Sequence, residues 1–240
     1  MVYEVDEHKI GGENVKMKVM LINGSPRKNG ATGTVLRKMS EMCLSYKNVE
    51  IDLVYLADLK MEYCKGCEVC YKKGGCIIKD DAEALASRLR NVDAVIVGSP
   101  TYASNVSGLM KTFIDRGHFV IEQALVHKYV VIVATGENYG KQDVVKILRK
   151  LVVYSGGRIC GSIALNVEFE KGIKIDDKLK RKIKENSEKL YQSGRRKKRY
   201  FIQELVHKAV FEVGIKPFVL RKGEDYRGVR KMWEEMGIGD

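Results

Sequence analysis

Short apolar runs rich in Val and Ile recur along the chain, separated by segments with helical periodicity. The runs at 17–22, 93–97 and 129–134 are nearly continuous in hydrophobicity, as expected of strands covered on both faces. Two weaker strand candidates, 49–53 and 158–165, complete the set. Strands that are linked through helices pair in parallel, because each connection crosses one face of the sheet. The pattern therefore predicts an α/β fold in which a doubly wound parallel sheet of five strands forms a three-layer sandwich with helices.

The intervening segments carry apolar residues three and four positions apart, which is typical of amphipathic helices. Helices are expected at 32–46, 81–90, 108–126 and 142–155. A further helix at 176–192 would close the second face of the sheet. Five strands with helices in this order indicate a flavodoxin-like topology.

The last part of the chain falls outside this alternation. We interpret 1–194 as one core domain and 195–240 as a basic helical C-terminal extension, with helices expected at 200–213 and 225–236. The extension begins with RRKKR at 195–199, within a chain of net charge +12. Five consecutive cations can bind phosphate backbones, anionic lipid or an acidic partner, but most such runs are only solvated, so nucleic-acid binding stays unproven.

Length and composition narrow the class further. A chain of 240 residues accommodates one buried α/β core with an appendage. The acidic start MVYEVDEHKI does not resemble a signal peptide, and no apolar run approaches the roughly 20 residues of a membrane span. We therefore expect a cytoplasmic protein without a transmembrane segment. Disulfides are not expected there, and the isolated Cys43 and Cys160 are assigned to the core.

Four cysteines fall within thirteen residues, on a loop at 60–80 inserted in the core. The spacing C-x2-C-x2-C-x5-C supplies the ligand count of one [4Fe-4S] cluster, and the x2 gaps let neighbouring cysteines reach adjacent irons. The last gap contains Gly74 and Gly75, and Ile77 stands where ferredoxins carry proline, so the fourth ligand can come from the same chain. Zinc, or thiols that bind no metal, are the alternatives. The expected metal ligands are Cys64, Cys67, Cys70 and Cys76.

A loop rich in glycine and hydroxyl groups, at 23–34, lies directly between the first strand and the first helix. Gly24, Gly30 and Gly33 permit tight turns, and Arg27 supplies a forked cation beside a helix N-terminus, which suits a phosphate group. The loop matches neither G-x-x-x-x-G-K-[ST] nor G-x-G-x-x-G, which disfavours a nucleoside triphosphate or a Rossmann dinucleotide. A monophosphate fits better, and an ordinary polar turn is the alternative.

Two more polar loops follow the third and fourth strands. In open α/β sheets, ligands bind outside the carboxyl ends of the strands, where these loops meet. The loop at 98–108 offers Tyr102 to pack on a flat heterocycle, while Asn105 and the backbone can bond to its polar edge. The loop at 135–140, TGENYG, adds glycine and further polar groups.

The segments GSPRKNGATGTVL, GSPTYASNVSGLMKTFIDR and TGENYG resemble the NADPH-dependent FMN reductase group of flavodoxin-like proteins over about residues 17–165. The cysteine motif resembles that of the iron–sulfur flavoproteins within this group. Members often carry Asn or Ser where this chain has Gly30 or Ala31, which removes a side-chain donor but keeps the backbone N–H. The residues that the resemblance implies around FMN are Ser25, Arg27, Asn29, Thr32 and Gly33 near the phosphate, Pro100, Thr101, Tyr102, Ser104, Asn105 and Val106 along the ribityl chain and ring, and Thr135, Gly136 and Tyr139 at the other edge of the ring.

These features predict an iron–sulfur flavoprotein that passes electrons between a [4Fe-4S] cluster and FMN, with ferredoxin or NAD(P)H as donor. The resemblance also implies a homodimer or a higher homo-oligomer. Two alternatives stay open: an NAD(P)H-dependent FMN or quinone reductase whose cysteine loop is structural, and a flavin-containing sensor that binds nucleic acid or membrane through 195–240. No catalytic acid or base stands out, and His118 and His127 fall at ordinary helical positions of the expected fold.

Overall fold

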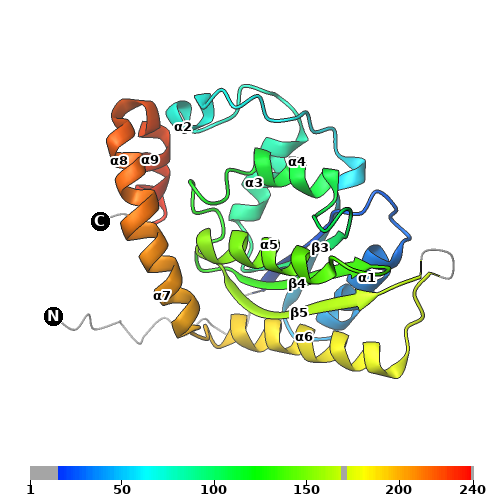
Figure 1. The fold of residues 1–240 in the computed structure, drawn as a ribbon. Helices are drawn as coiled ribbons and strands as arrows, with labels where there is room; N and C mark the ends of the chain where they lie inside the picture. Colours follow the sequence, from blue (N-terminus) through cyan, green and yellow to red (C-terminus); the bar gives the residue numbers. More distant parts are fainter. Residues whose placement is uncertain (1–15, 169–171, 239–240) are drawn as a thin grey trace.

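The computed structural model describes residues 16–168 and 172–238, so the acidic start at 1–10 lies outside the described residues. A five-stranded parallel sheet with the order β2-β1-β3-β4-β5 runs through the centre of the molecule (Figure 1). This is the flavodoxin-like order, and the predicted fold class is confirmed. The strands are β1 (Met17–Asn23), β2 (Val49–Tyr55), β3 (Ala94–Pro100), β4 (Tyr129–Gly136) and β5 (Arg158–Asn166).

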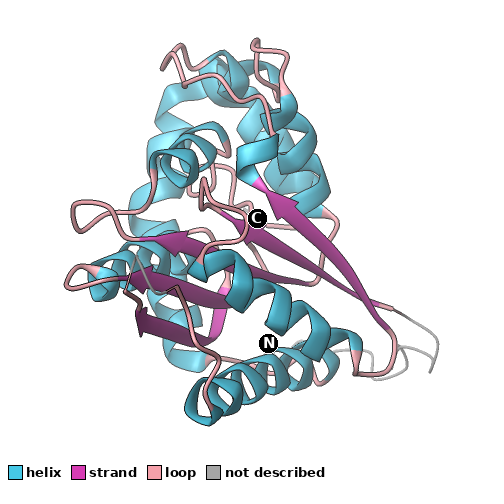
Figure 2. Ribbon diagram, turned by 90° about the vertical axis from the view of Figure 1, so that its right-hand side faces the viewer, coloured by secondary structure: helices cyan, strands magenta, loops and turns pink. Residues whose placement is uncertain are grey.

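Helices cover both faces of the sheet (Figure 2). Successive side chains of a strand point to opposite faces, so Val19 packs with α1 and α6 whereas Met20 packs with α3, α4 and α5. Each fully buried aliphatic side chain contributes about 1.5–3 kcal/mol. These helices are α1 (Ala31–Leu44), α3 (Asp81–Arg90), α4 (Gly108–Arg116), α5 (Lys141–Tyr154) and α6 (Asp177–Arg195).

Every residue of β3 and β4 is buried, as their continuous apolar runs predict. β2 is only partly buried and pairs on one side alone, which fits the alternating polarity of its sequence. After β1 the chain continues to β2 on one side of the sheet, whereas after β3 it continues to β4 on the other side. The strand order therefore reverses between β1 and β3. This reversal brings the loops after β1, β3 and β4 to one edge.

The helix expected at 108–126 is much shorter, because α4 ends at Arg116 and turns follow it. His118 and Gln123 adopt left-handed φ values of 46° and 55°, which an α-helix does not accommodate. The Gln123 amide also donates to the carbonyls of Val120 and Tyr154, in competition with helical bonding. The prediction failed because apolar residues after Arg116, Ile121 with Ala124 and Leu125, recur three and four positions apart in the sequence although the backbone turns.

The C-terminal extension is helical, as predicted, but Pro217 does not end its first helix. A π-type turn precedes the proline, and a wider turn of this kind accommodates a residue without an N–H. The extension stands beside the sheet and reaches the short helix of the cysteine loop, α2 (Val69–Lys73) (Figure 1). Its elements are α7 (Phe201–Val210), η2 (Phe211–Ile215), α8 (Lys216–Lys222), η3 (Gly223–Tyr226) and α9 (Arg227–Glu235).

A separate apolar cluster holds the extension together. Phe211 stacks edge-on against Trp233 at 4.9 Å between ring centroids, and Tyr226 lies 4.7 Å from Tyr71 of α2. The Trp233 indole donates a hydrogen bond to the Ile121 carbonyl. The extension is therefore anchored to α2 through Tyr226 and to the segment after α4 through Trp233. The division at residue 194 stays an interpretation of the sequence. In the parts of the chain that are described, no helix combines the length and apolarity needed to cross a bilayer.

Candidate functional site

The loop after β1 folds back over the start of α1. The Ser25 amide donates to Asn23 Oδ1, and Ser25 Oγ accepts from the Arg27 amide. The first-turn amides of an α-helix lack intrahelical acceptors, and Gly30 at the N-cap of α1 provides no side-chain acceptor. A Cβ on Gly33 would lie 1.9 Å from the Lys28 carbonyl oxygen, so the return of the loop requires glycine here. Uncapped amides and Arg27 thus line one pocket, an arrangement that suits an anion.

The loop after β3 contains a tight turn closed by two backbone bonds between Tyr102 and Asn105, 3.0 and 2.9 Å long. Ala103 and Ser104 at its centre both adopt left-handed φ values, 48° and 59°. Non-glycine residues in this region cost free energy and are frequent at ligand sites. The turn leaves the Tyr102 ring 41% exposed at the edge of the sheet.

The loop after β4 packs tightly against the two others. Thr135 Oγ1 lies 2.7 Å from Thr32 Oγ1, and the Thr135 carbonyl accepts from the Thr101 amide at 2.7 Å. A Cβ on Gly140, whose φ is +83°, would lie 2.8 Å from Ser104 Cα. All three predicted loops therefore meet at the carboxyl edge, as the strand order requires.

A pocket at this edge is formed by residues of the first and third loops, by Pro100, and by Val167, Glu168 and Gly172 after β5. The Thr101 hydroxyl and the Asn23 Nδ2 are buried without a hydrogen-bond partner among the described residues. Unpaired buried polar groups of this kind mark a place where a polar ligand bonds. The predicted residues that line the pocket are Ser25, Arg27, Thr32, Pro100, Thr135 and Gly136.

The other predicted FMN residues occupy the same loops outside this pocket. Val106 is buried in the apolar core, and the Asn105 side chain accepts from the Val106 amide. Tyr139 is 72% exposed. Sequence reasoning missed Asn23, whose unpaired amide adjoins the anion site; as the last residue of β1 it carried no signal distinct from the strand pattern.

The cysteine loop lies between β2 and α3, where the sequence placed it, and its base is closed by hydrogen bonds. After the short turn η1 (Leu56–Asp58), Lys60 exchanges two bonds with Asp81, of 2.7 and 3.1 Å. The Glu62 amide donates to Asp80 Oδ2, and the Asp80 side chain also caps α3 at the Ala82 amide. The two ends of the loop are therefore held together.

Arg116, the last residue of α4, braces the loop from inside. Its buried guanidinium donates to both Asp80 oxygens at 2.6 and 2.9 Å and to the Glu62 carbonyl at 2.8 Å. It also lies 3.6 Å from Cys76 Sγ. Burial alone would raise the pKa of Asp80, but the bonds from Arg116 and from two backbone amides outweigh burial and lower it. The interaction with Asp80 raises the pKa of Arg116 in turn, so the pair stays charged.

The four cysteines of the loop differ in their surroundings. All are free thiols; Cys64 and Cys67 are exposed, Cys76 is half-buried, and Cys70 is buried within α2. Over residues 16–168 and 172–238, no three side chains of Cys, His, Asp or Glu are arranged to hold a metal ion. The donor chemistry fits an iron–sulfur cluster, but the structure does not gather the four sulfurs, and the predicted ligand set stays a prediction.

Cys70 faces a buried polar chain. Its Sγ lies 3.3 Å from His118 Nε2, His118 Nδ1 lies 3.1 Å from Glu122 Oε1, and Glu122 Oε2 lies 3.6 Å from Arg90. Burial alone would lower the pKa of His118, but its interactions with Cys70 and Glu122 outweigh burial and raise it to about 10. The sequence placed His118 at an ordinary helical position; that interpretation is wrong, because the helix ends two residues earlier.

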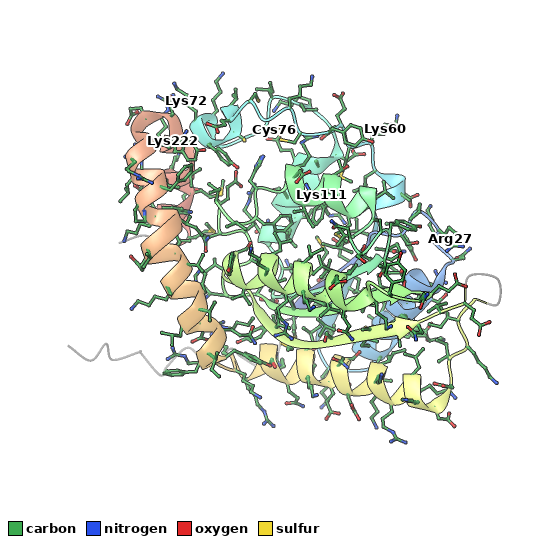
Figure 3. All side chains as sticks on the ribbon, viewed as in Figure 1. Arg27, Lys60, Lys72, Cys76, Lys111 and Lys222 are labelled. Atoms are coloured by element: carbon green, nitrogen blue, oxygen red, sulfur yellow. The ribbon has the colours of Figure 1, made fainter. Side chains whose placement is uncertain are left out.

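The C-terminal extension packs against α2 through η3 and α9. Lys72 binds Asp225 at 2.9 Å, and Lys222 lies 3.7 Å from Glu68. Figure 3 shows Lys72 and Lys222 side by side, at the end of the cysteine loop remote from Lys60. A Cβ on Gly228 would lie 2.5 Å from the Gly74 amide nitrogen, which shows how closely α9 approaches the loop.

A five-stranded parallel sheet with three polar loops converging at its carboxyl edge defines the flavodoxin-like class of protein. The chain belongs to the NADPH-dependent FMN reductase family, whose sequence model matches residues 17–172. It is therefore a flavin-dependent oxidoreductase.

Comparison with individual proteins gives relatives in sequence and a solved structure with a similar fold. An iron–sulfur flavoprotein of Clostridioides difficile is 35% identical over 225 residues, which cover 92% of this chain and all of that protein. An iron–sulfur flavoprotein of Archaeoglobus fulgidus is 41% identical over 100 residues, which cover 42% of this chain and 45% of that protein. Among solved structures, the apo form of the NADH:FMN oxidoreductase EmoB superposes with a TM-score of 0.57 at 18% identity, over 74% of this chain and 90% of that chain; this likeness concerns the fold alone.

Proposed function

We propose that the protein passes electrons between FMN and one [4Fe-4S] cluster, with ferredoxin or a reduced nicotinamide as the donor. The observation that carries the proposal is the set of four free thiols on one short loop, in a chain that matches an iron–sulfur flavoprotein over that protein's whole length. When bound, FMN exchanges two electrons and the cluster one, so together they convert between two-electron and one-electron partners.

The carboxyl edge would hold FMN. Arg27 and the uncapped first-turn amides of α1 would bind the phosphate, because both present N–H donors to an anion. The unpaired Thr101 hydroxyl would bond to a polar group of the ribityl chain or ring. Tyr102 and Tyr139, both exposed, would pack beside the ring and exclude water from it.

The cysteine loop would hold the cluster through Cys64, Cys67, Cys70 and Cys76. Gly66 and Gly74 adopt left-handed φ values with open space around them, so the exposed part of the loop can turn without clashes. The Arg116 guanidinium lies 3.6 Å from Cys76 Sγ and would donate to that sulfur. In this proposal the two glycines let the loop bring the four thiolates to one place, and Arg116 donates to one of them.

We also infer that the protein acts as a homodimer or a higher homo-oligomer. Large apolar side chains of α7 are exposed, with Phe201 at 75%, Ile202 at 80% and Leu205 at 66%. A contiguous apolar face of this kind supports an interface. Light scattering on the purified protein in solution should give at least twice the chain mass of 27.2 kDa. A mass of one chain would refute the inference.

Anaerobic purification followed by iron, sulfide and flavin analysis tests the proposal. We expect about four irons, about four sulfides and one FMN per chain. Cys67→Ala should lose the iron and keep the flavin, because the two sites lie on different loops. The matched control is Cys43→Ala, a buried cysteine of α1 outside the loop, which should keep both groups.

The second candidate is an NAD(P)H-dependent FMN or quinone reductase with a structural cysteine loop. The match to the NADPH-dependent FMN reductase family and the ungathered sulfurs favour it. Flavin without iron after anaerobic reconstitution would select this candidate. The sensor alternative rests on the exposed basic run 195–199 alone, because η3 and α9 pack on the cysteine helix and α7 packs on α5.

A further inference from the structure

We propose that the end of α4 positions two of the four cysteines, Cys70 through His118 and Cys76 through Arg116, and that these two donors tune the reduction potential of the cluster. His118 and Arg116 would position the two cysteines in the protein without iron as well. The tuning rests on the proposed function.

His118 is built to face Cys70. Its left-handed backbone, with φ 46°, turns the chain back at the end of α4, and the ring is almost buried. Glu122, only 5% exposed, accepts from Nδ1. Because that carboxylate fixes one ring nitrogen, the other is directed at Cys70 Sγ. Arg90 beside Glu122 offsets the cost of burying the carboxylate.

Arg116 acts on the second cysteine from the same end of α4. Four of its bonds go to Asp80, Glu62 and Ile78, which fixes the plane of the guanidinium. Its Nη2 then lies 3.6 Å from Cys76 Sγ, and its buried Nε has no partner among the described residues. The Cys76 sulfur therefore lies at Nη2, a nitrogen that also donates to Asp80 Oδ1 and the Ile78 carbonyl and is held in place by them.

Hydrogen bonds to cysteine sulfur lower the electron density on the ligand and raise the potential of an iron–sulfur cluster. Two cysteines would then be placed before iron arrives, and the exposed Cys64 and Cys67 would complete the set by moving. Cys64 Sγ accepts a bond from the Gly66 amide of its own loop at 3.4 Å, whereas Cys70 and Cys76 face side chains from the end of α4.

The test compares His118→Phe, which keeps a buried ring and removes both nitrogens, with His118→Gln, which restores an amide donor. In the loaded protein, His118→Phe should shift the cluster potential to more negative values, His118→Gln should recover part of the shift, and the FMN potential should stay unchanged. The control is His127→Phe, because His127 also has a left-handed φ, 62°, but is exposed in the turn before β4, away from the cysteines.

The protein without iron gives an independent readout. Hydrogen exchange of peptides that cover 66–76 should be on the order of fivefold faster in His118→Phe, which corresponds to one lost hydrogen bond. Glu122→Gln keeps the ring and weakens its orientation, so it should give smaller changes of both kinds and serves if His118→Phe does not fold.

The outcomes separate the two proposals. Wild-type protein that takes up no iron refutes the proposed function, while the exchange measurement still decides the positioning. Wild type and variants with equal cluster potentials and equal exchange at 66–76 would overturn the inference even if all of them bind iron.

Discussion

At Gly33, the carbonyl oxygen of Lys28 occupies the space that a side chain would need. Backbone oxygen cannot move aside as a flexible side chain does, so any larger residue must push the anion-binding loop away from α1. Position 116 instead requires a large side chain, because Arg116 fills a buried site and donates to the Glu62 and Ile78 carbonyls and to the Asp80 carboxylate. Single residues at these two points decide whether the flavin loop and the cysteine loop keep their shapes.

Gly33→Ala should destabilise the fold by about 1–3 kcal/mol, the usual cost of overpacking, and should weaken FMN binding because the loop is displaced. Urea unfolding gives the first quantity and flavin fluorescence titration the second. Gly108→Ala is the control, since a Cβ there meets nothing within 4 Å. Equal FMN affinity in both variants would contradict the role given to the loop.

Asp80→Asn should destabilise the protein by about 3–5 kcal/mol at neutral pH, because it leaves the Arg116 cation buried without its partner. The folded-state pKa of Asp80 is lowered, so its ionised form stabilises the fold above the unfolded pKa of about 3.9, and that contribution is lost as the pH falls through the lower folded value. The difference between wild type and variant in free energy of unfolding should therefore shrink below about pH 4. Asp115→Asn removes an exposed pair with Lys111 and should cost less than about 1 kcal/mol. A difference that is as large at pH 3 as at pH 7 would argue against the ion pair.

Among the elements, α2 and the C-terminal helices form one packed unit. The five-residue α2 is too short to be stable alone, and it is held by Tyr226, by the Lys72–Asp225 pair and by the close approach of α9. Since α2 carries Cys70, the extension has a structural part in the candidate cluster site. This packing could not be predicted, because contacts between residues about 150 positions apart leave no local pattern in the sequence.

Trp233→Ala should loosen this unit. Loss of the buried ring costs about 3–5 kcal/mol and also removes the bond to the Ile121 carbonyl. Hydrogen exchange across α2 should rise while exchange in β3 and β4 stays slow. Val213→Ala, in the same extension but 80% exposed and outside the proposed interface, should change neither. Unchanged exchange in α2 of Trp233→Ala would show that the extension does not support the cysteine loop.

At the scale of the whole molecule, the alternation of buried strands and helices was sufficient to predict the sheet, because strands covered on both faces are apolar throughout. The same rule predicted that three loops meet at one edge, and the structure brings them together. The end of α4 could not be predicted, since Ala124 and Leu125 stand three and four positions after Ile121 in the sequence although the backbone there forms turns. The chain Cys70–His118–Glu122 depends on that turn and was missed with it.

The central claim is that one chain carries two electron carriers, and an anaerobic reductive titration tests it most directly. Protein with both groups bound should take up about three electrons per chain, two by FMN and one by the cluster. Cys67→Ala should take up about two. An uptake of two electrons by wild-type protein, with the same endpoint in the variant, would contradict the account.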